Sequence, residues 1–416
     1  MQMKNFFVNI LEYVFVSIIL IEFNTPYLIL PSVQFVIRFV PLLLLFVLIL
    51  LKYKYIKFDW LFILIIVGSI LPLINVRADS TFRYVRFYML FFPFSYLYLK
   101  AGLRESLKAA YSLLFKLSSV VLILSVVSLF FWIFGTTLNI MQPTATFPYE
   151  WDNVRDYIST YYGLYFETQH TQFLGVELNR NSGIFCEAPM YNMILCIALS
   201  IELYLREEKS KLRILILSLT IISTFTTTGQ FFLIINIFLL LYRGLNKYLK
   251  VILFVMMPFV IVGFYMVVSL LLIDKKQTIE GESSVNSREK DIELCIKNGL
   301  ENPILGKSLF YRMDDHGNSY FGYSNSIFTL FAHGGIYTIL LYVVSLLIVP
   351  FLYYIKKHDL DWLLLMICFF ILFAVTMSHY RYLTIFYVAF NLTKLPELMY
   401  KRRIKGAFLL KENKVI

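Results

Sequence analysis

The chain has 416 residues, of which 59% are hydrophobic, 18% aromatic and only 16% charged. A soluble domain carries about 25% charged residues, so this composition excludes a soluble globular protein. Apolar runs at 33–51, 111–134 and 251–273 are each long enough to cross the hydrocarbon core of a bilayer. The sequence therefore predicts an all-α polytopic membrane protein that forms a single integral membrane domain over residues 1–416.

About twelve hydrophobic runs predict membrane-spanning helices. The first run contains Glu12 and Glu22 and lacks a small-residue cleavage site, so we expect a retained helix and not a cleaved signal peptide. The predicted helices lie near residues 6–23, 30–51, 60–74, 84–99, 111–134, 187–205, 213–228, 230–242, 251–273, 327–355, 361–378 and 382–399.

The formal net charge of +11 reflects topology. The basic residues gather in every second connection between hydrophobic runs and in the C-terminal tail. By the positive-inside rule these connections and both termini are cytoplasmic, and the alternate loops face out. We therefore expect no nucleic-acid partner. The basic connections include Lys52, Lys100, Arg104, Arg206, Lys209, Lys211, Arg213, Arg243, Lys356 and Lys357, and the tail includes Lys401, Arg402 and Arg403.

Two long polar loops, residues 135–186 and 274–326, are predicted on the outer side. The first is rich in aromatic residues, which argues against disorder, so we expect it to pack at the membrane surface. In the second, residues 286–301 have the spacing of an amphipathic helix, with Asn286 as its predicted cap. Arg288 would lie on the apolar edge of this helix, where it needs a carboxylate or a ligand phosphate as a partner.

Several ionisable residues interrupt the apolar runs. Glu12 and Lys116 are costly in lipid and should face protein or a cavity. We expect Glu22 to pair with Arg38 near the outer ends of the first two helices. Arg86, with Arg77 and Arg83 beside it, is expected to reach lipid headgroups, and capture of a pyrophosphate is the alternative role. Cys186 and Cys295 both fall in the outer loops and would form a disulfide only if they lie close together.

The segment Arg180-Asn-Ser-Gly183-Ile-Phe185-Cys-Glu187-Ala-Pro189 precedes a hydrophobic run. A proline suits the first turn of a helix, and a carboxylate just before it suits the positive end of the helix dipole. One interpretation is therefore purely structural, with Glu187 as a helix cap and Arg180 as a solvated loop residue.

Three segments together resemble the O-antigen and capsular polysaccharide polymerases of the Wzy type and the related O-antigen ligases. The first is the segment from Arg180 to Pro189, and the second is Thr226-Thr-Thr-Gly229-Gln230 between two apolar runs. The third starts at Ser287-Arg288, passes through Asn302-Pro303-Ile-Leu-Gly306, and reaches Asn325 with Gly335 ten residues later. The order of the motifs, the loop sizes and the helix count agree with this family over most of the chain.

The resemblance implies a metal-free, inverting transfer of glycan from undecaprenyl pyrophosphate to a sugar hydroxyl, at the outer face of the bacterial cytoplasmic (inner) membrane. Arginine forks bind phosphate oxygens, so Arg180 and Arg288 are the expected diphosphate ligands. Glu187 is the best placed base for the acceptor hydroxyl. Asn325, His333 and Arg381 are further candidate substrate-binding residues. The sequence has no D-x-D metal site, nucleotide fold or ATPase signature, so neither a metal nor a cofactor is expected.

One departure bears on the choice within the family, because ligases carry a histidine directly before the asparagine and this chain has Ser324 before Asn325. The expected activity is therefore a repeat-unit polymerase, with a ligase of the same fold as the alternative. His316 and His333 are the remaining histidine candidates for a catalytic role. The expected partners are the lipid-linked oligosaccharide, membrane lipid, a chain-length regulator and a flippase.

A flippase or transporter of lipid-linked oligosaccharide is the alternative from a different class. Such proteins are usually built from two related halves with little mass outside the membrane. The sequence shows no internal repeat, and its outer loops are long.

Overall fold

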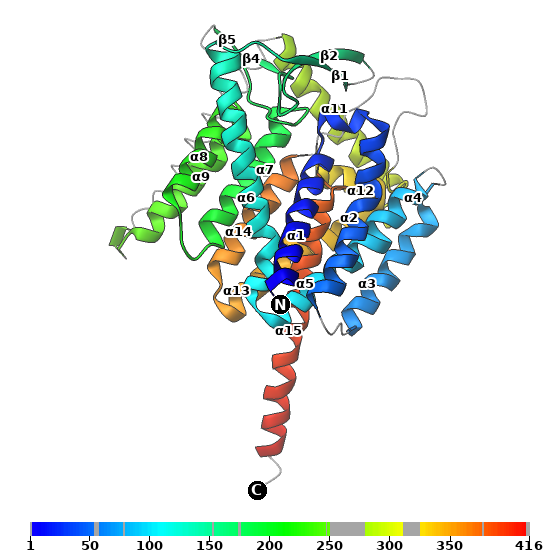
Figure 1. The fold of residues 1–416 in the computed structure, drawn as a ribbon. Coiled ribbons are helices and arrows are strands. Elements are labelled where there is room, and N and C mark those ends of the chain that lie inside the picture. Colours follow the sequence, from blue (N-terminus) through cyan, green and yellow to red (C-terminus); the bar gives the residue numbers. More distant parts are fainter. Residues whose placement is uncertain are drawn as a thin grey trace.

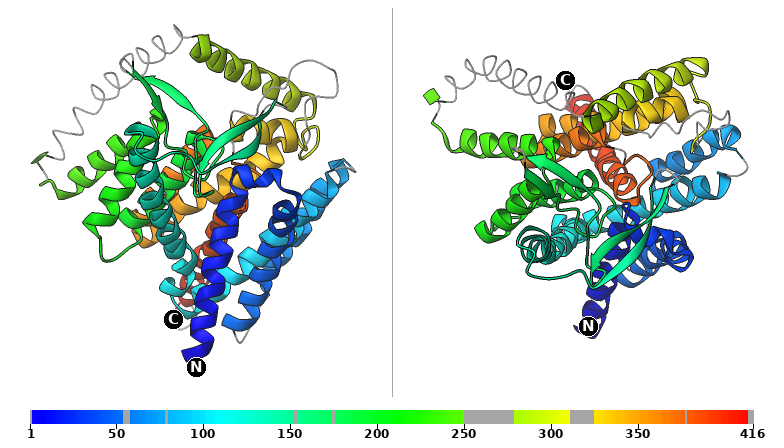
Figure 2. Two further views of the ribbon diagram at one scale, coloured as in Figure 1. Left: turned by 45° about the horizontal axis from the view of Figure 1, so that its top comes forward. Right: turned by 90° about the horizontal axis from the view of Figure 1, so that it is seen from above.

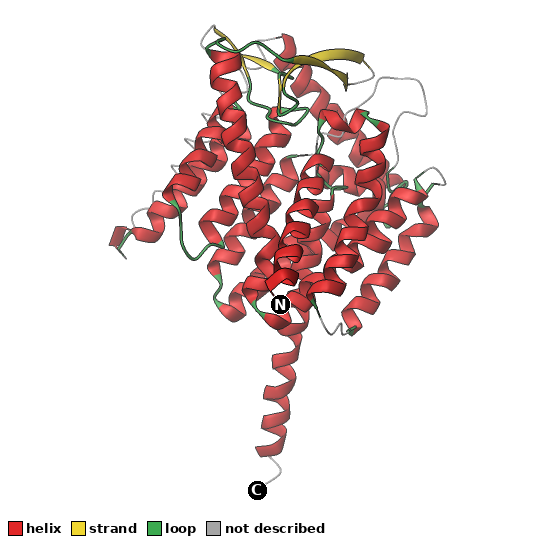
Figure 3. Cartoon of the chain, in the orientation of Figure 1, coloured by secondary structure: helices red, strands yellow, loops and turns green. Residues whose placement is uncertain are grey.

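A computed structural model describes residues 2–53, 58–77, 80–151, 154–173, 176–246, 248–249, 279–310, 325–376 and 378–412. The chain is mostly helical, and the helices pack side by side in one bundle (Figures 1 and 3). Among the described residues, four helical segments are long and apolar enough to cross a membrane: Met3–Glu22, Pro31–Lys52, Leu107–Thr137 and Ser326–Lys357. Shorter apolar helices lie at Trp60–Asn75, Ala188–Tyr204, Thr227–Leu240 and Leu360–Val375.

The helices of the first half are α1 (Gln2–Glu22), α2 (Pro31–Lys52), α3 (Trp60–Ile70), α4 (Thr81–Tyr84), α5 (Phe92–Glu105) and α6 (Leu107–Phe131). The second half holds α7 (Ala188–Tyr204), α8 (Lys211–Ser223), α9 (Thr227–Gly244), α11 (Ile279–Glu301), α12 (Ser326–Val343), α13 (Val349–Lys357), α14 (Leu360–Val375) and α15 (Tyr382–Glu412). Short 3₁₀ turns η1 (Pro26–Ile29) and η2 (Leu71–Asn75) and π-helical segments η3 (Val85–Phe91), η4 (Trp132–Thr137) and η5 (Val344–Ile348) join or extend them. The predicted span at 251–273 lies outside the described residues.

The described part of the first long loop contains five β-strands, so the all-α prediction is wrong there. Strands β1 (Ala145–Trp151), β2 (Val154–Tyr161) and β3 (Tyr165–Phe166) form one antiparallel sheet, and β4 (His170–Phe173) pairs with β5 (Val176–Asn179). Tyr162 and Gly163 both have positive φ, which closes the tight turn between β2 and β3. A search for long apolar runs does not detect such short hairpins, because successive side chains of a strand point to opposite faces of the sheet.

The described part of this loop is ordered and packs against the helix bundle; its expected position at the membrane surface stays a prediction. The ring of Tyr27 meets Phe147 at 5.6 Å and Phe166 at 5.4 Å, and its hydroxyl donates to the carbonyl of Gly163. The indole Nε1 of Trp132 donates to the carbonyl of Asn179 at 2.7 Å. Viewed from above, the hairpins lie across the end of the bundle (Figure 2). They cover the helix ends where the candidate site lies.

The predicted amphipathic helix is present as α11, but it begins at Ile279 and not at Asn286. Asn286 therefore lies inside the helix and does not cap it. The helix packs against α12, with Asp291, Cys295 and Asn298 buried and Arg288 exposed. The hairpins of the first long loop and α11 of the second lie at the end of the bundle opposite to the start of α1 and the end of α15 (Figure 1).

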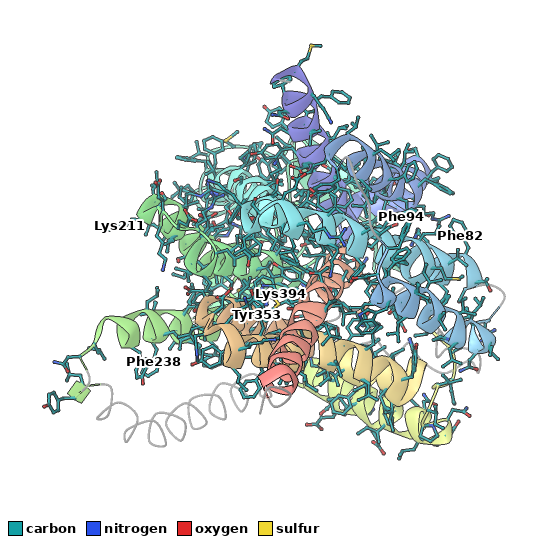
Figure 4. The ribbon with its side chains drawn as sticks, turned by 90° about the horizontal axis from the view of Figure 1, so that it is seen from below. Phe82, Phe94, Lys211, Phe238, Tyr353 and Lys394 are labelled. Atoms are coloured by element: carbon teal, nitrogen blue, oxygen red, sulfur yellow. The ribbon has the colours of Figure 1, made fainter. Side chains whose placement is uncertain are left out.

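Charges within the helices are mostly matched. The Glu12 carboxylate, 1% exposed, accepts from Lys52 Nζ at 2.7 Å and also pairs with Lys116, as expected of charges that avoid lipid. Tyr98 and Ser112 complete the cluster with hydroxyl donors at 2.5 and 2.8 Å. At the same end, Lys394 lies beside Tyr353, with its Nζ 3.7 Å from the centre of the Trp362 ring (Figure 4).

The predicted pair of Glu22 and Arg38 is wrong. Glu22 Oε1 lies 3.3 Å from Arg381 Nη1, whereas Arg38 is exposed and donates to Gln34 one turn earlier at 3.0 Å. Arg38 points away from the core on α2, so its side chain cannot reach the carboxylate. Arg381 comes from a chain position 359 residues from Glu22, which hydropathy cannot pair.

We predict that Glu12→Ala lowers the free energy of unfolding by about 3 kcal/mol, because it leaves two half-buried ammonium groups without a counter-charge. Thermal unfolding of the detergent-purified protein measures this loss. Glu207→Ala is the matched control, since Glu207 is exposed and its removal should change stability by less than about 0.5 kcal/mol. Equal melting temperatures for the two variants would show that the cluster is not stabilising.

Candidate functional site

Glu187 stands at the start of α7, at the end of the bundle covered by the hairpins. It is the N-cap residue by backbone position, but its side chain makes no capping hydrogen bond. The side-chain oxygen of Gln169 accepts from the amide of Ala188 instead, at 3.0 Å. The structural interpretation of Glu187 as a side-chain cap is therefore wrong. Within the described part of the chain, its carboxylate has no hydrogen-bond or ion-pair partner.

The positive charges of three arginines act on this carboxylate without a direct ion pair among the described residues. Arg180 follows β5, Arg288 lies on α11, and Arg381 directly precedes α15. Burial raises the pKa of Glu187 to about 7, and the positive charges of the three arginines oppose that rise. The site therefore holds one carboxylate that titrates near neutral pH within a strongly positive field.

Arg180 is fixed by backbone contacts that bring two of the motifs together. Its amide donates to the carbonyl of Gln169 at 2.9 Å, and its Nε donates to the carbonyl of Thr224 at 3.0 Å. Thr224 lies in the break between α8 and α9, where Thr226 caps α9 through the amide of Gly229. Burial lowers the pKa of Arg180 to about 10, so the guanidinium remains charged at neutral pH.

The residues between Arg180 and Glu187 set the path of the chain. Asn181 Nδ2 donates to Ser223 Oγ at 2.9 Å, and Ser182 Oγ donates to the carbonyl of Phe166 at 2.8 Å. Gly183 has φ +56°, and an added Cβ would lie 2.9 Å from the ring of Tyr191. Phe185 stacks on the same ring at 5.2 Å. The motif is therefore a rigid turn that holds Arg180 and Glu187 at its two ends.

The two glycines of the third motif, Gly306 and Gly335, have structural roles. Gly335 has φ +60° and kinks α12, and the freed amides of Ile336 and Tyr337 donate to the carbonyls of Pro303 and Ile304. An added Cβ on Gly306 would lie 2.3 Å from the backbone carbon of His333. The Asn302–Gly306 segment is thus inserted into the kink, which fixes the C-terminal end of α11 against α12.

Asn325 and His333, two further predicted site residues, have structural roles in α12. Asn325 caps α12, since its side-chain oxygen accepts from the amides of Ile327 and Phe328 at 2.9 and 3.3 Å. His333 is 1% exposed, and its Nδ1 lies 2.8 Å from the hydroxyl of Tyr380, against which the ring stacks. A base for a sugar hydroxyl must be accessible, which His333 is not. His316 lies outside the described residues.

Besides Arg180 and Glu187, Arg381 is the predicted site residue with the clearest connection to the site. It joins Glu22 at the end of α1 to the Glu187 site, because its guanidinium bonds the first carboxylate and acts electrostatically on the second. Sequence analysis missed Gln169, which takes over the capping of α7, and Tyr149 of β1. The Tyr149 hydroxyl donates to the carbonyl of Cys186 at 3.3 Å, and burial raises the pKa of Tyr149, with a smaller contribution from the negative charge of Glu187. Both residues lie in hairpin segments without a distinctive spacing.

The four cysteines are free and buried. Cys186 and Cys295 are therefore not joined in this structure. The amide of Cys186 donates to the carbonyl of Asn24 at 2.9 Å, which ties the motif to the end of α1. Cys186 is held in place by its backbone and not by a disulfide.

No family model, curated protein or solved structure matches the chain.

We predict that Glu187 titrates with a pKa near 7 and that Arg180→Gln raises this pKa, because the carboxylate loses the nearest opposing positive charge. The protonated carboxyl stretch in difference infrared spectra reports the titration, with Glu187→Gln as the reference that removes the band. A pKa close to 4.5 in the unmodified protein would contradict the burial of this carboxyl group.

Proposed function

We propose that the chain is a polymerase of polysaccharide repeat units. It transfers glycan from undecaprenyl pyrophosphate to a sugar hydroxyl of another lipid-linked repeat unit, at the outer face of the cytoplasmic membrane. The observation that carries this proposal is the carboxylate of Glu187, held without a direct partner among three arginines. The three motifs that resemble the Wzy-type polymerases add support, because Arg180 of the first bonds the carbonyl of Thr224, two residues before the second.

The arginines suit a diphosphate leaving group. When the bond between the sugar C1 and the diphosphate oxygen breaks, negative charge develops on that oxygen. A guanidinium offers planar pairs of N–H donors to such oxygens and keeps its charge throughout. Arg180 is rigidly held for this role, whereas Arg288 is exposed on α11 and completes the site from the other loop.

Glu187 suits the acceptor side of the reaction. As the new bond forms between C1 and the acceptor oxygen, the hydroxyl proton passes to the carboxylate, and attack from the face opposite the diphosphate inverts the anomeric centre. A pKa of about 7 leaves much of the group ionised at neutral pH and makes it a stronger base than an ordinary carboxylate. One site therefore contains both a base and leaving-group stabilisation.

The proposed topology places about twelve spans in the bacterial inner membrane, with both termini cytoplasmic and both long loops outside. The basic connections Lys356–Lys357 and Arg206–Arg213 support this orientation through the positive-inside rule. The proposed partners are lipid-linked oligosaccharide, surrounding lipid, a flippase that delivers the substrate and a regulator of chain length. A ligase that passes the same donor to a different acceptor would need the same arginines.

Cysteine labelling tests the topology. Asp156→Cys on exposed β2 should react with a membrane-impermeant maleimide in intact spheroplasts, whereas Lys209→Cys should react only after permeabilisation. The four native cysteines are buried, which keeps the background low. Protection of Asp156→Cys until permeabilisation would place the candidate site on the wrong side of the membrane.

Arg180→Ala and Arg288→Ala test the function. Each should reduce polymer formation by about 10²-fold or more while single repeat units accumulate on the carrier, because an uncompensated charge develops on the leaving diphosphate. Lysine should rescue poorly at either position, since it lacks the planar fork. Gel separation of the glycan and immunoblots of membrane protein are the measurements, and Arg38→Ala is the control. Near-normal polymer in both alanine variants would refute the site.

A further inference from the structure

Arg86 is a buried arginine without a polar partner. It lies on the π-helical segment η3 and is only 9% exposed, so the expectation that it reaches lipid headgroups is wrong. Its guanidinium carries five N–H donors. Among the described residues it forms no hydrogen bond and no ion pair, and its Nε is fully buried and unsatisfied.

The surroundings of Arg86 are aromatic and positively charged. Its Cζ lies 4.5 Å from the centre of the Phe87 ring and 5.8 Å from that of Tyr382, the residue that follows Arg381. The carboxylate of Glu22 is the counter-charge of Arg86, and it interacts electrostatically with both Arg86 and Arg381. Each oxygen of Glu22 already has a partner, Oε1 in Arg381 Nη1 and Oε2 in the amide of Tyr382 at 3.4 Å, and neither oxygen bonds Arg86. Two guanidinium groups thus share one occupied carboxylate, which leaves one positive charge in excess.

An unpaired buried guanidinium is costly, and two aromatic faces offset only part of that cost. Three buried carboxylates of the bundle have direct counter-charges: Glu12 pairs with Lys52 and Lys116, Glu22 pairs with Arg381, and Glu202 pairs with Arg206 and Arg213. The environment of Arg86 is therefore that of a side chain whose hydrogen-bond acceptor is supplied by a bound ligand. The ligand must be an anion with several oxygens, because the donors of a guanidinium point in several directions within one plane.

The position of Arg86 relates it to the proposed reaction. Arg381 bonds Glu22 beside Arg86 and also acts on Glu187, so the two positively charged regions are joined by one side chain. We propose that Arg86 and Arg381 form a second anion subsite, which takes the diphosphate of a lipid carrier at the outer ends of α1 and α15. A polymerase holds two lipid-linked chains at once, and Arg180 with Arg288 accounts for one diphosphate. The assignment of the second carrier rests on the proposed function.

Binding to the purified full-length protein tests this subsite without any need for turnover. In lipid nanodiscs, the unmodified protein should bind two equivalents of undecaprenyl diphosphate. Arg86→Gln should weaken one of them about ten- to a hundred-fold, the value of a charge-assisted contact, and leave the other unchanged. Arg180→Ala should weaken the other one. Arg38→Gln is the matched control, since this arginine is exposed on the neighbouring helix and has its own acceptor in Gln34.

Two further measurements keep the result decisive. Without ligand, Arg86→Met should melt at a temperature no lower than the unmodified protein, because an apolar chain replaces an unpaired charge. A lower melting temperature would mean that Arg86 holds the fold, and it would overturn the subsite. Unchanged diphosphate binding in Arg86→Gln, or loss of phosphatidylglycerol binding instead, would also overturn it. Failure of the polymerase proposal would appear separately, as normal polymer in Arg180→Ala beside an intact Arg86-dependent binding step.

Discussion

The balance of buried charge governs this structure. Inside an apolar bundle each charge needs an opposite partner, and most have one at short distance. Glu12 is matched by Lys52 and Lys116. Glu202, which is 0% exposed, is matched by Arg206 and Arg213 at 2.9 and 2.7 Å. These clusters fix the packing of α1, α2, α6, α7 and α8.

Glu187 and Arg86 stand out from this pattern, and both lie toward the end that carries the hairpins. Among the described residues, Glu187 has no direct partner and burial raises its pKa to about 7, while the buried Arg86 has no hydrogen-bond acceptor. Arg381 stands between them. Unbalanced charges are costly to hold in place, so their position marks the part of the molecule where a charged ligand is expected.

Sequence analysis predicted the parts of the fold that depend on hydrophobicity. The long apolar helices, the ordered aromatic loop and the buried charge on Glu12 follow from composition and from the cost of charge in lipid. The β-hairpins were missed because their strands are short and alternate, and the α11 start was missed because the polar residues before Asn286 continue the helix. The count of about twelve spans is not confirmed, since four long and four shorter apolar helices are described.

The candidate site was predictable only in part. Only six residues lie between Arg180 and Glu187, with a glycine turn among them, so local spacing already brings these two charges within electrostatic range of each other. Arg288 also reaches the site electrostatically. Asn325 and His333 instead serve the helix α12, one as its cap and the other as a packed ring. The contact of Arg381 with Glu22 joins the two ends of the chain, which local sequence patterns do not reveal.

The rate of polymer formation by the purified protein, measured against pH for the unmodified chain and for Glu187→Gln, is the most direct measurement of the central claim. If Glu187 is the base, the rate rises as pH increases through about 7, because the carboxylate form accepts the acceptor proton. Glutamine at this position should then slow the reaction by about 10²–10⁴-fold and abolish the pH step. An active Glu187→Gln variant with the same pH profile would contradict the role of Glu187.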